Sequence, residues 1–141
     1  MSGSGSNGSG PQRSIAVVGG GFGGVGAVVL LNRAGYTDVT VFEKADGIGG
    51  VWHHNTYPGA ACDVPSHLYE FSFAPNPRWS RRYAPGDEIT AYLEDLVERE
   101  GVGDRIRTGV EVTRATFDET RAKWMLETTG GPHEVLSLIH I

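Results

Sequence analysis

Ile15-Ala-Val-Val-Gly-Gly-Gly-Phe-Gly-Gly24 is the stretch that decides the fold of this chain, and Glu43 follows it nineteen residues later. The run Ile15–Val18 is short, apolar and rich in β-branched residues, which predicts a strand buried on both faces of a parallel sheet. The glycines after it contain the pattern G-x-G-x-x-G, which is typical of nucleotide-binding βαβ units.

Each glycine of this pattern has its own mechanical role. Gly19 allows a tight turn, Gly21 lets the backbone approach a pyrophosphate, and Gly24 lets helix and strand pack closely. Residues 22–34 place three valines at helical spacing, so we expect a helix whose positive N-terminal end points at the anion. We expect Gly35 to end this helix.

Glu43 stands at the carboxyl end of a second expected strand, residues 39–42. A carboxylate at this position can accept hydrogen bonds from both ribose hydroxyls of an adenosine. Its negative charge disfavours a 2′-phosphate, so the unit suits FAD or NAD rather than NADP. A glycine-rich loop without function is the alternative, but strand, glycines, helix, second strand and acid within about thirty residues argue against it.

Length and composition narrow the class of protein. The 141 residues suffice for one domain with a modest core. Twelve basic and seventeen acidic residues give a net charge of −5, so there is no basic footprint for nucleic acid, and no apolar run reaches the length of a membrane span. A single cysteine and the lack of a secretion signal favour the cytoplasm. The Gly- and Ser-rich residues 1–13 predict a flexible tail.

Residues 44–69 carry too many glycines and prolines for regular structure, and a loop of this length inside a compact domain is often functional. The glycine pair at 49–50 would let the backbone approach a ligand, beside the flat apolar faces of Trp52 and Tyr57. A surface loop whose aromatic side chains only pack on the core is the alternative. The adjacent histidines at 53–54 point in different directions, which argues against a metal site.

The remaining chain predicts structural elements. Residues 87–101 form the clearest expected helix, with Asp87 as its cap, Gly101 as its end and a charged outer face. Residues 105–108 predict a short strand, and the alternation from 110 to 129 predicts a hairpin that could cover one face of the sheet. One further strand would start at about residue 133 and stop incomplete.

The last six residues, Leu136-Ser-Leu-Ile-His-Ile141, have a different origin in our interpretation. They resemble the translation of the transposon-end adaptor CTGTCTCTTATACACATC used in sequencing libraries, and the match covers all six codons. We therefore expect the native sequence to end at about Val135. Residues 136–141 would be a non-native tail outside the folded domain of residues 14–135.

Five short motifs occur together in this chain: Gly19–Gly24, Glu43, Gly49-Gly-Val-Trp52, Tyr57-Pro-Gly-Ala60 and Cys62-Asp-Val-Pro-Ser66. In this combination the chain resembles the amino-terminal part of the Baeyer-Villiger flavin monooxygenases, and within them the cyclohexanone and hydroxyacetophenone monooxygenase group. The similarity runs from about residue 14 to residue 133. It implies an α/β fold, a Rossmann-like FAD-binding domain with a βαβ unit, a long cofactor loop, a helix and a β-hairpin.

Enzymes of this family bind FAD in one Rossmann-like domain and NADPH in a second, and they use O2 to insert one oxygen atom beside a ketone. The resemblance implies that the FAD contacts are spread along the chain. The pyrophosphate would lie against Gly19, Gly21, Gly23 and Gly24, and the ribose against Glu43. The ribityl and flavin side would be lined by Gly50, Val51, Trp52 and His53, with further cofactor contacts from Tyr69 and, through its backbone at the adenine, Val112.

Asp63 resembles the family's catalytic aspartate beneath the flavin, which works with an arginine far downstream to position NADPH. By the same resemblance, Ala61 and Cys62 would lie next to the nicotinamide cofactor. From the residues alone, an aspartate before Val-Pro is more often a turn former, so this role depends on the resemblance.

Several parts of the family pattern are missing from this sequence: the second glycine motif for NADPH, the linker fingerprint, the partner arginine and the Ala-Thr-Gly strand that finishes the FAD domain. We therefore expect an incomplete domain that is inactive by itself and holds FAD weakly. A nitrogen- or sulfur-oxidising flavin monooxygenase is one alternative, and Tyr57-Pro-Gly59 together with Asp63 argues against it. A non-catalytic nucleotide-binding module is the other, and a native stop codon soon after Val135 would support it.

Overall fold

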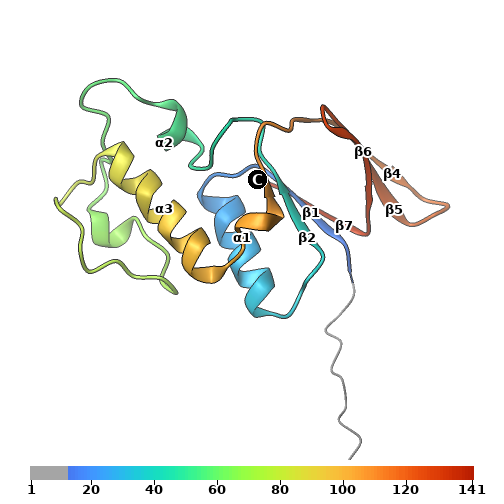
Figure 1. Cartoon of the computed structure of the whole chain (residues 1–141), viewed down its shortest axis with the longest axis horizontal. Coiled ribbons are helices and arrows are strands. Elements are labelled where there is room, and N and C mark those ends of the chain that lie inside the picture. Colours follow the sequence, from blue (N-terminus) through green and yellow to red (C-terminus); the bar gives the residue numbers. More distant parts are fainter. Residues whose placement is uncertain (1–12) are drawn as a thin grey trace, which may run out of the picture.

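The computed structural model describes residues 13–141, so the flexible tail predicted for residues 1–13 lies almost entirely outside the described residues. A parallel sheet of four strands forms the middle of the domain. Two helices cover one of its faces and an antiparallel sheet of three strands lies on the other (Figure 1). No helix in this described part is long and apolar enough to cross a membrane.

The parallel sheet has the strand order β3-β2-β1-β7. Its two central strands are β1 (Ile15–Val18) and β2 (Val39–Phe42), as predicted, and Val17 pairs with Val41 in their register. Both valines are completely buried, because the helices cover one face and the antiparallel sheet the other. The strand predicted at 105–108 is the short edge strand β3 (Ile106–Arg107).

Helix α1 (Phe22–Arg33) starts at the glycines and packs on the parallel sheet. The predicted valine stripe is confirmed, since Val25, Val28 and Val29 have no exposed surface. Gly35 follows the helix with φ +89°, which is the left-handed conformation expected of a glycine just past a helix end.

Helix α3 (Gly86–Glu100) packs beside α1 with its apolar stripe inward. Gly101 ends it in the left-handed conformation, as predicted, with φ +64°. The predicted cap at Asp87 is wrong, because the carbonyl of Pro85 accepts the N–H groups of Glu88 and Ile89 at 3.1 and 3.2 Å, and the helix therefore starts before Asp87.

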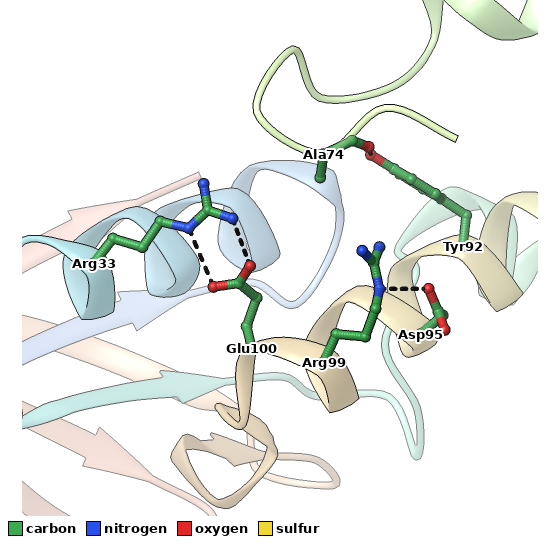
Figure 2. A network of polar contacts seen from close by, with 6 residues as sticks. All are labelled: Arg33, Ala74, Tyr92, Asp95, Arg99 and Glu100. Atoms are coloured by element: carbon green, nitrogen blue, oxygen red, sulfur yellow. Dashed lines mark hydrogen bonds and ion pairs between the residues drawn. The ribbon is translucent and has the colours of Figure 1, made fainter. Parts of the chain in front are cut away.

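The two helices are also joined by an ion pair between Arg33 of α1 and Glu100 of α3, whose Nη2 and Oε1 atoms are 2.5 Å apart (Figure 2). The hydrogen bond from Arg33 lowers the pKa of Glu100. This contact is partly exposed, so the buried stripe of α3 contributes more to the packing than the ion pair does.

The long segment after Glu43 is not entirely irregular. It contains the short helices α2 (Val51–His54) and η1 (Ser66–Leu68). Gly50 precedes α2 with φ +59°, a conformation that favours glycine and turns the chain into the helix. The prediction of a loop therefore holds for most of this segment and is wrong at residues 51–54 and 66–68.

The predicted hairpin is confirmed as β4 (Val112–Asp118) and β5 (Lys123–Thr128). The next strand, β6 (Gly131–Val135), pairs with β5 along its full length, so the expectation of an incomplete strand is wrong. A tight turn explains this pairing, since the Thr128 hydroxyl donates to the carbonyl of Gly131 at 2.6 Å. As predicted, this sheet covers one face of the parallel sheet, where Leu126 and Val135 pack on Ala16 and Phe42.

Residues 136–141 lie within the fold, contrary to expectation. Strand β7 (Ser137–His140) pairs in parallel with β1 and supplies the sheet strand that was expected to be missing. The physical reason is the open edge of β1, which offers hydrogen-bonding groups to any extended segment with apolar side chains such as Leu138 and Ile139. The adaptor origin of these residues stays a prediction.

Candidate functional site

The glycine loop joins β1 to α1 with no room for side chains at its two ends. Gly19 has φ +110°, a conformation that favours glycine. A Cβ atom added to Gly24 would lie 1.8 Å from the carbonyl oxygen of Gly19, so only glycine lets the helix approach the end of the strand. The predicted mechanical roles of the first and third glycines agree with these contacts.

The amino-terminal end of α1 presents unpaired N–H groups. The first hydrogen bond of the helix runs from Val25 N–H to the carbonyl of Gly21, at 3.0 Å. The three preceding N–H groups, from Phe22 to Gly24, find no acceptor among residues 13–141. Together with the helix dipole, these donors form a site suited to an anion such as a phosphate.

Glu43 lies at the glycine loop with only 6% of its surface exposed. Its Oε2 accepts the N–H of Gly20 at 2.6 Å, and its Oε1 accepts the N–H of Ala45 at 2.7 Å. These bonds hold the carboxylate in one orientation beside the loop. Sequence reasoning missed Gly20, although its place between the first two glycines of the motif is where such a contact could have been sought.

A hollow of about 280 Å³ opens at the carboxyl ends of β1 and β2. It brings together three of the predicted cofactor residues, Gly19, Glu43 and Val112, from segments far apart in the sequence. The strands and the antiparallel sheet supply the rest of the wall: Val18, Phe42, Lys44, Val110, Glu111, His140 and Ile141. Sequence reasoning predicted none of these seven. The hollow is lined by a carboxylate, backbone groups and apolar side chains. A carboxylate suits the ribose of an adenosine, and backbone and apolar groups suit its base.

A second loop packs directly against the first. The N–H of Gly49 donates to the carbonyl of Gly20 at 3.0 Å. A Cβ atom added to Gly50 would lie 3.1 Å from the Cα of Gly21, so the two backbones approach closely. The predicted cofactor residues Gly21 and Gly50 therefore lie side by side, and the segment that follows Gly50 begins at the glycine loop.

Helix α2 starts there and carries the predicted flavin-side residues. Val51 is 59% exposed, and Trp52 is half-buried. The indole Nε1–H of Trp52 donates to the hydroxyl of Tyr69 at 3.1 Å, and the ring of Tyr69 stands edge-on to Phe22 at 4.9 Å. Aromatic side chains thus form a continuous wall from α2 to the first residue of α1.

His53, the next residue of α2, contacts Asp46. Its Nε2 and the Asp46 Oδ1 are 2.7 Å apart, and this hydrogen bond lowers the pKa of Asp46. The contact ties the segment before Gly49 to α2.

A larger cleft, of about 640 Å³, lies beyond α2 and is bordered by the start of α3. Three predicted residues line it: Trp52, His53 and Ala61. Tyr57, Gly59 and Ala60 of the Tyr57-Pro-Gly-Ala60 motif also line it. The remaining lining residues were not predicted as site residues: Asn55, Thr56, Arg81, Pro85, Gly86, Asp87 and Thr90. The cleft is mixed in character, with aromatic faces and two charged side chains.

Asp63 and Cys62 line neither hollow. Asp63 is exposed, whereas Cys62 is buried, and its Sγ accepts the N–H of Val64 at 3.4 Å. Tyr69 and Gly23 also lie outside both linings, Tyr69 in the aromatic wall and Gly23 in the first turn of α1. The predicted role of Asp63 requires NADPH and the family's downstream arginine, so it stays a prediction.

Comparison with known proteins agrees with this geometry. The family described as an NAD(P)-binding Rossmann-like domain matches residues 17–84. A Baeyer-Villiger monooxygenase of Streptomyces coelicolor is 50% identical over 117 residues, which are 83% of this chain and 22% of that protein. An FAD-binding monooxygenase of Botryotinia fuckeliana is 46% identical over 89 residues, 63% of this chain and 17% of its own.

Solved structures show the same architecture. The crystal structure of cyclohexanone monooxygenase from Rhodococcus sp. Phi1 bound to NADP+ superposes with a TM-score of 0.83 at 39% identity. The superposition covers 91% of this chain and 25% of that one. The predicted resemblance is confirmed, and the chain spans about a quarter or less of the length of these relatives.

Proposed function

We propose that the glycine loop and Glu43 of this chain, which is similar to Baeyer-Villiger and cyclohexanone monooxygenases, hold the adenosine diphosphate part of FAD. The observation that carries the proposal is the juxtaposition of unpaired N–H groups at the start of α1 with the fixed, buried carboxylate of Glu43. The first suits the pyrophosphate and the second suits the ribose hydroxyls.

The described residues fit this group. Five of the six residues from Gly19 to Gly24 are glycines, so a ligand at this loop would contact the backbone itself rather than side chains. Val112 lines the same hollow as Gly19 and Glu43, and its backbone would contact the adenine. The buried charge of Glu43 disfavours a 2′-phosphate, so we assign NADPH to a different site of the whole protein.

In the whole protein, FAD together with NADPH would supply the insertion of one oxygen atom of O2 beside a ketone carbonyl. This chain's own residues would bind and orient. Trp52 and Tyr69, held together by their hydrogen bond, would form an apolar wall that keeps water from the flavin side. We propose that Gly50, Val51 and His53 line the same side and that Asp63, with Ala61 and Cys62 beside it, acts on NADPH once the other parts are in place.

Two other functions are less well supported. A nitrogen- or sulfur-oxidising flavin monooxygenase would have the same glycine loop, but the relatives named above include a Baeyer-Villiger monooxygenase and a cyclohexanone monooxygenase. A non-catalytic nucleotide-binding module would use the loop and Glu43 alone. Measuring the products of the full-length parent decides between these, since esters from ketones would support our proposal and N-oxides alone would contradict it.

Nucleotide titration tests the proposed site in this chain directly. Wild type and Glu43→Gln would be titrated calorimetrically with ADP, FAD and adenosine 2′,5′-bisphosphate. We expect wild type to prefer ADP over the 2′-phosphorylated probe, and Glu43→Gln to bind ADP about tenfold more weakly and to lose the preference. Glu111→Gln is the matched control, because Glu111 lines the same hollow and, within residues 13–141, its hydrogen bonds come from its backbone and not its side chain.

Equal ADP affinity of wild type and Glu43→Gln would contradict the assignment. For the chain by itself we expect no monooxygenase activity and little retention of yellow colour during purification. A stoichiometric flavin spectrum would show that the hollow is sufficient for tight binding. We place the reaction in the cytoplasm, with a small ketone and O2 as the reaction partners of the whole protein.

A further inference from the structure

The glycine loop has an unexpected neighbour, Ile141. The N–H of Ile141 donates to the carbonyl of Val18 at 3.2 Å, which extends the pairing of β7 with β1 by one residue. This bond directs the chain past the carboxyl end of β1 and onto the loop. The end of the chain lies next to the start of α1 in Figure 1.

Contacts on both sides of the cradle define the position of Ile141. A Cβ atom added to Gly23 would lie 2.4 Å from Ile141 Cγ2, so this methyl group covers the Cα of Gly23. A Cβ atom added to Gly19 would lie 3.3 Å from the Ile141 carbonyl oxygen. Ile141 thus borders both the turn after β1 and the first turn of α1, and it lines the hollow that contains Glu43.

The chemistry of this residue is opposed to that of the site. The N–H groups of residues 22–24 offer hydrogen bonds to an anion, whereas the branched side chain of Ile141 offers none. With 55% of its surface exposed, the side chain is not needed to fill the core. A pyrophosphate at these N–H groups would be crowded by the Cγ2 methyl and would exchange water on that side for an apolar surface.

We propose that Ile141 is an affinity-determining residue of the nucleotide site, where its side chain narrows the cradle and weakens binding. This inference rests on the proposed function. It assigns the expected weak retention of FAD to one side chain rather than to a missing strand. The size of the residue at position 141 therefore controls the affinity for ADP and FAD.

A series of side-chain sizes tests this inference by calorimetric titration with ADP and FAD. We expect Ile141→Gly to bind ADP about tenfold more tightly than wild type, Ile141→Ala to lie between them, and Ile141→Trp to bind more weakly. Leu136→Ala is the control, because Leu136 is a partly exposed apolar residue just before β7 and does not line the hollow. We expect it to bind like wild type.

The possible outcomes separate the two proposals. ADP affinities that agree within twofold for Ile141→Gly, Ile141→Ala and wild type would overturn the role of Ile141 and leave the nucleotide site in place. A lack of ADP and FAD binding in every variant would overturn both. If Ile141→Gly loses helical circular dichroism, the comparison of Ile141→Ala with Ile141→Trp decides, since equal affinities of those two would also overturn the inference.

Discussion

Replacing Tyr92 by phenylalanine removes one oxygen atom that joins α3 to the segment beside it. The Tyr92 hydroxyl donates to the carbonyl of Ala74 at 2.7 Å and accepts the N–H of Phe71 at 3.0 Å. Figure 2 shows the side chain reaching from α3 to Ala74. Phe71 in turn packs on Phe22, the first residue of α1, with ring centroids 5.1 Å apart. The Tyr92 hydroxyl therefore supports the start of α1 through Phe71.

The expected cost follows from the burial of this contact. Tyr92 and Ala74 are both 5% exposed, so water does not readily replace the lost hydroxyl. Phenylalanine keeps the ring and leaves a carbonyl and an N–H without their partner. Two lost hydrogen bonds at about 1 kcal/mol each, plus the cost of an unsatisfied buried group, give about 2–4 kcal/mol. For a domain of this size we expect Tm to fall by roughly 6–12 °C.

Urea unfolding measures this loss, with tryptophan fluorescence as the probe. Trp79 lies 5.2 Å from the ring of Tyr92 and reports on the same region. Tyr83→Phe is the control, because the Tyr83 side chain is 44% exposed and its hydroxyl has no hydrogen-bond partner in the part of the chain that the structure describes. A loss below about 0.5 kcal/mol for Tyr92→Phe, or one equal to that of the control, would refute the reasoning.

The Tyr92 hydroxyl should also make the stability of the fold depend on pH in the alkaline range. Burial raises the pKa of Tyr92 above its ordinary value of 10.0. Because the neutral hydroxyl is favoured in the folded state, its contribution is complete below the ordinary pKa and is lost as the pH rises through the folded-state pKa. We expect the stability of wild type to fall more steeply than that of Tyr92→Phe above about pH 10. Parallel curves would contradict this.

Three further perturbations test other parts of the structure. Gly101→Ala should destabilise the chain by about 1 kcal/mol in urea unfolding, because φ is +64° there and no neighbour within 4 Å can compensate; an unchanged midpoint would contradict this. Glu100→Gln should flatten the acid limb of a pH–stability curve, because the hydrogen bond and ion pair with Arg33 lower the pKa of Glu100 below 4.5. The stabilisation by this ion pair is present above pH 4.5 and is lost as the pH falls through the folded-state pKa. An acid limb as steep as that of wild type would argue against the ion pair. Removal of residues 136–141 should lower Tm by opening the edge of β1, whereas an unchanged Tm would restore the expectation that these residues lie outside the fold.

The elements that sequence patterns predicted best are those with local signals. Ile15–Val18 and Val39–Phe42 are apolar and β-branched, and both are strands with the predicted bounds. The valines of α1 and the glycine at 101 mark the face of one helix and the end of another. Each signal acts within a few residues, through side-chain burial or through a backbone angle that glycine adopts more readily than other residues.

Part of the candidate site could be predicted for the same reason. The glycine spacing and the acid at the end of the second strand place Gly19 and Glu43 at one edge of the sheet, because parallel strands end at the same edge, and Gly24 packs against Gly19 there. Gly20 was missed, since its N–H contact to Glu43 depends on how the loop is bent and not on its residue type. Asp63 had no local signal beyond a turn, and the structure leaves it exposed.

Residue pattern therefore determined the βαβ unit and the acid beside it, since both depend on local backbone preferences and on the regular spacing of apolar residues. Tertiary structure alone decided which segments meet at that unit. Residues 137–140 became a sheet strand because the edge of β1 was open to pairing, and Ile141 reached the glycine loop as a consequence. Such contacts join residues more than a hundred positions apart, and no local preference encodes them.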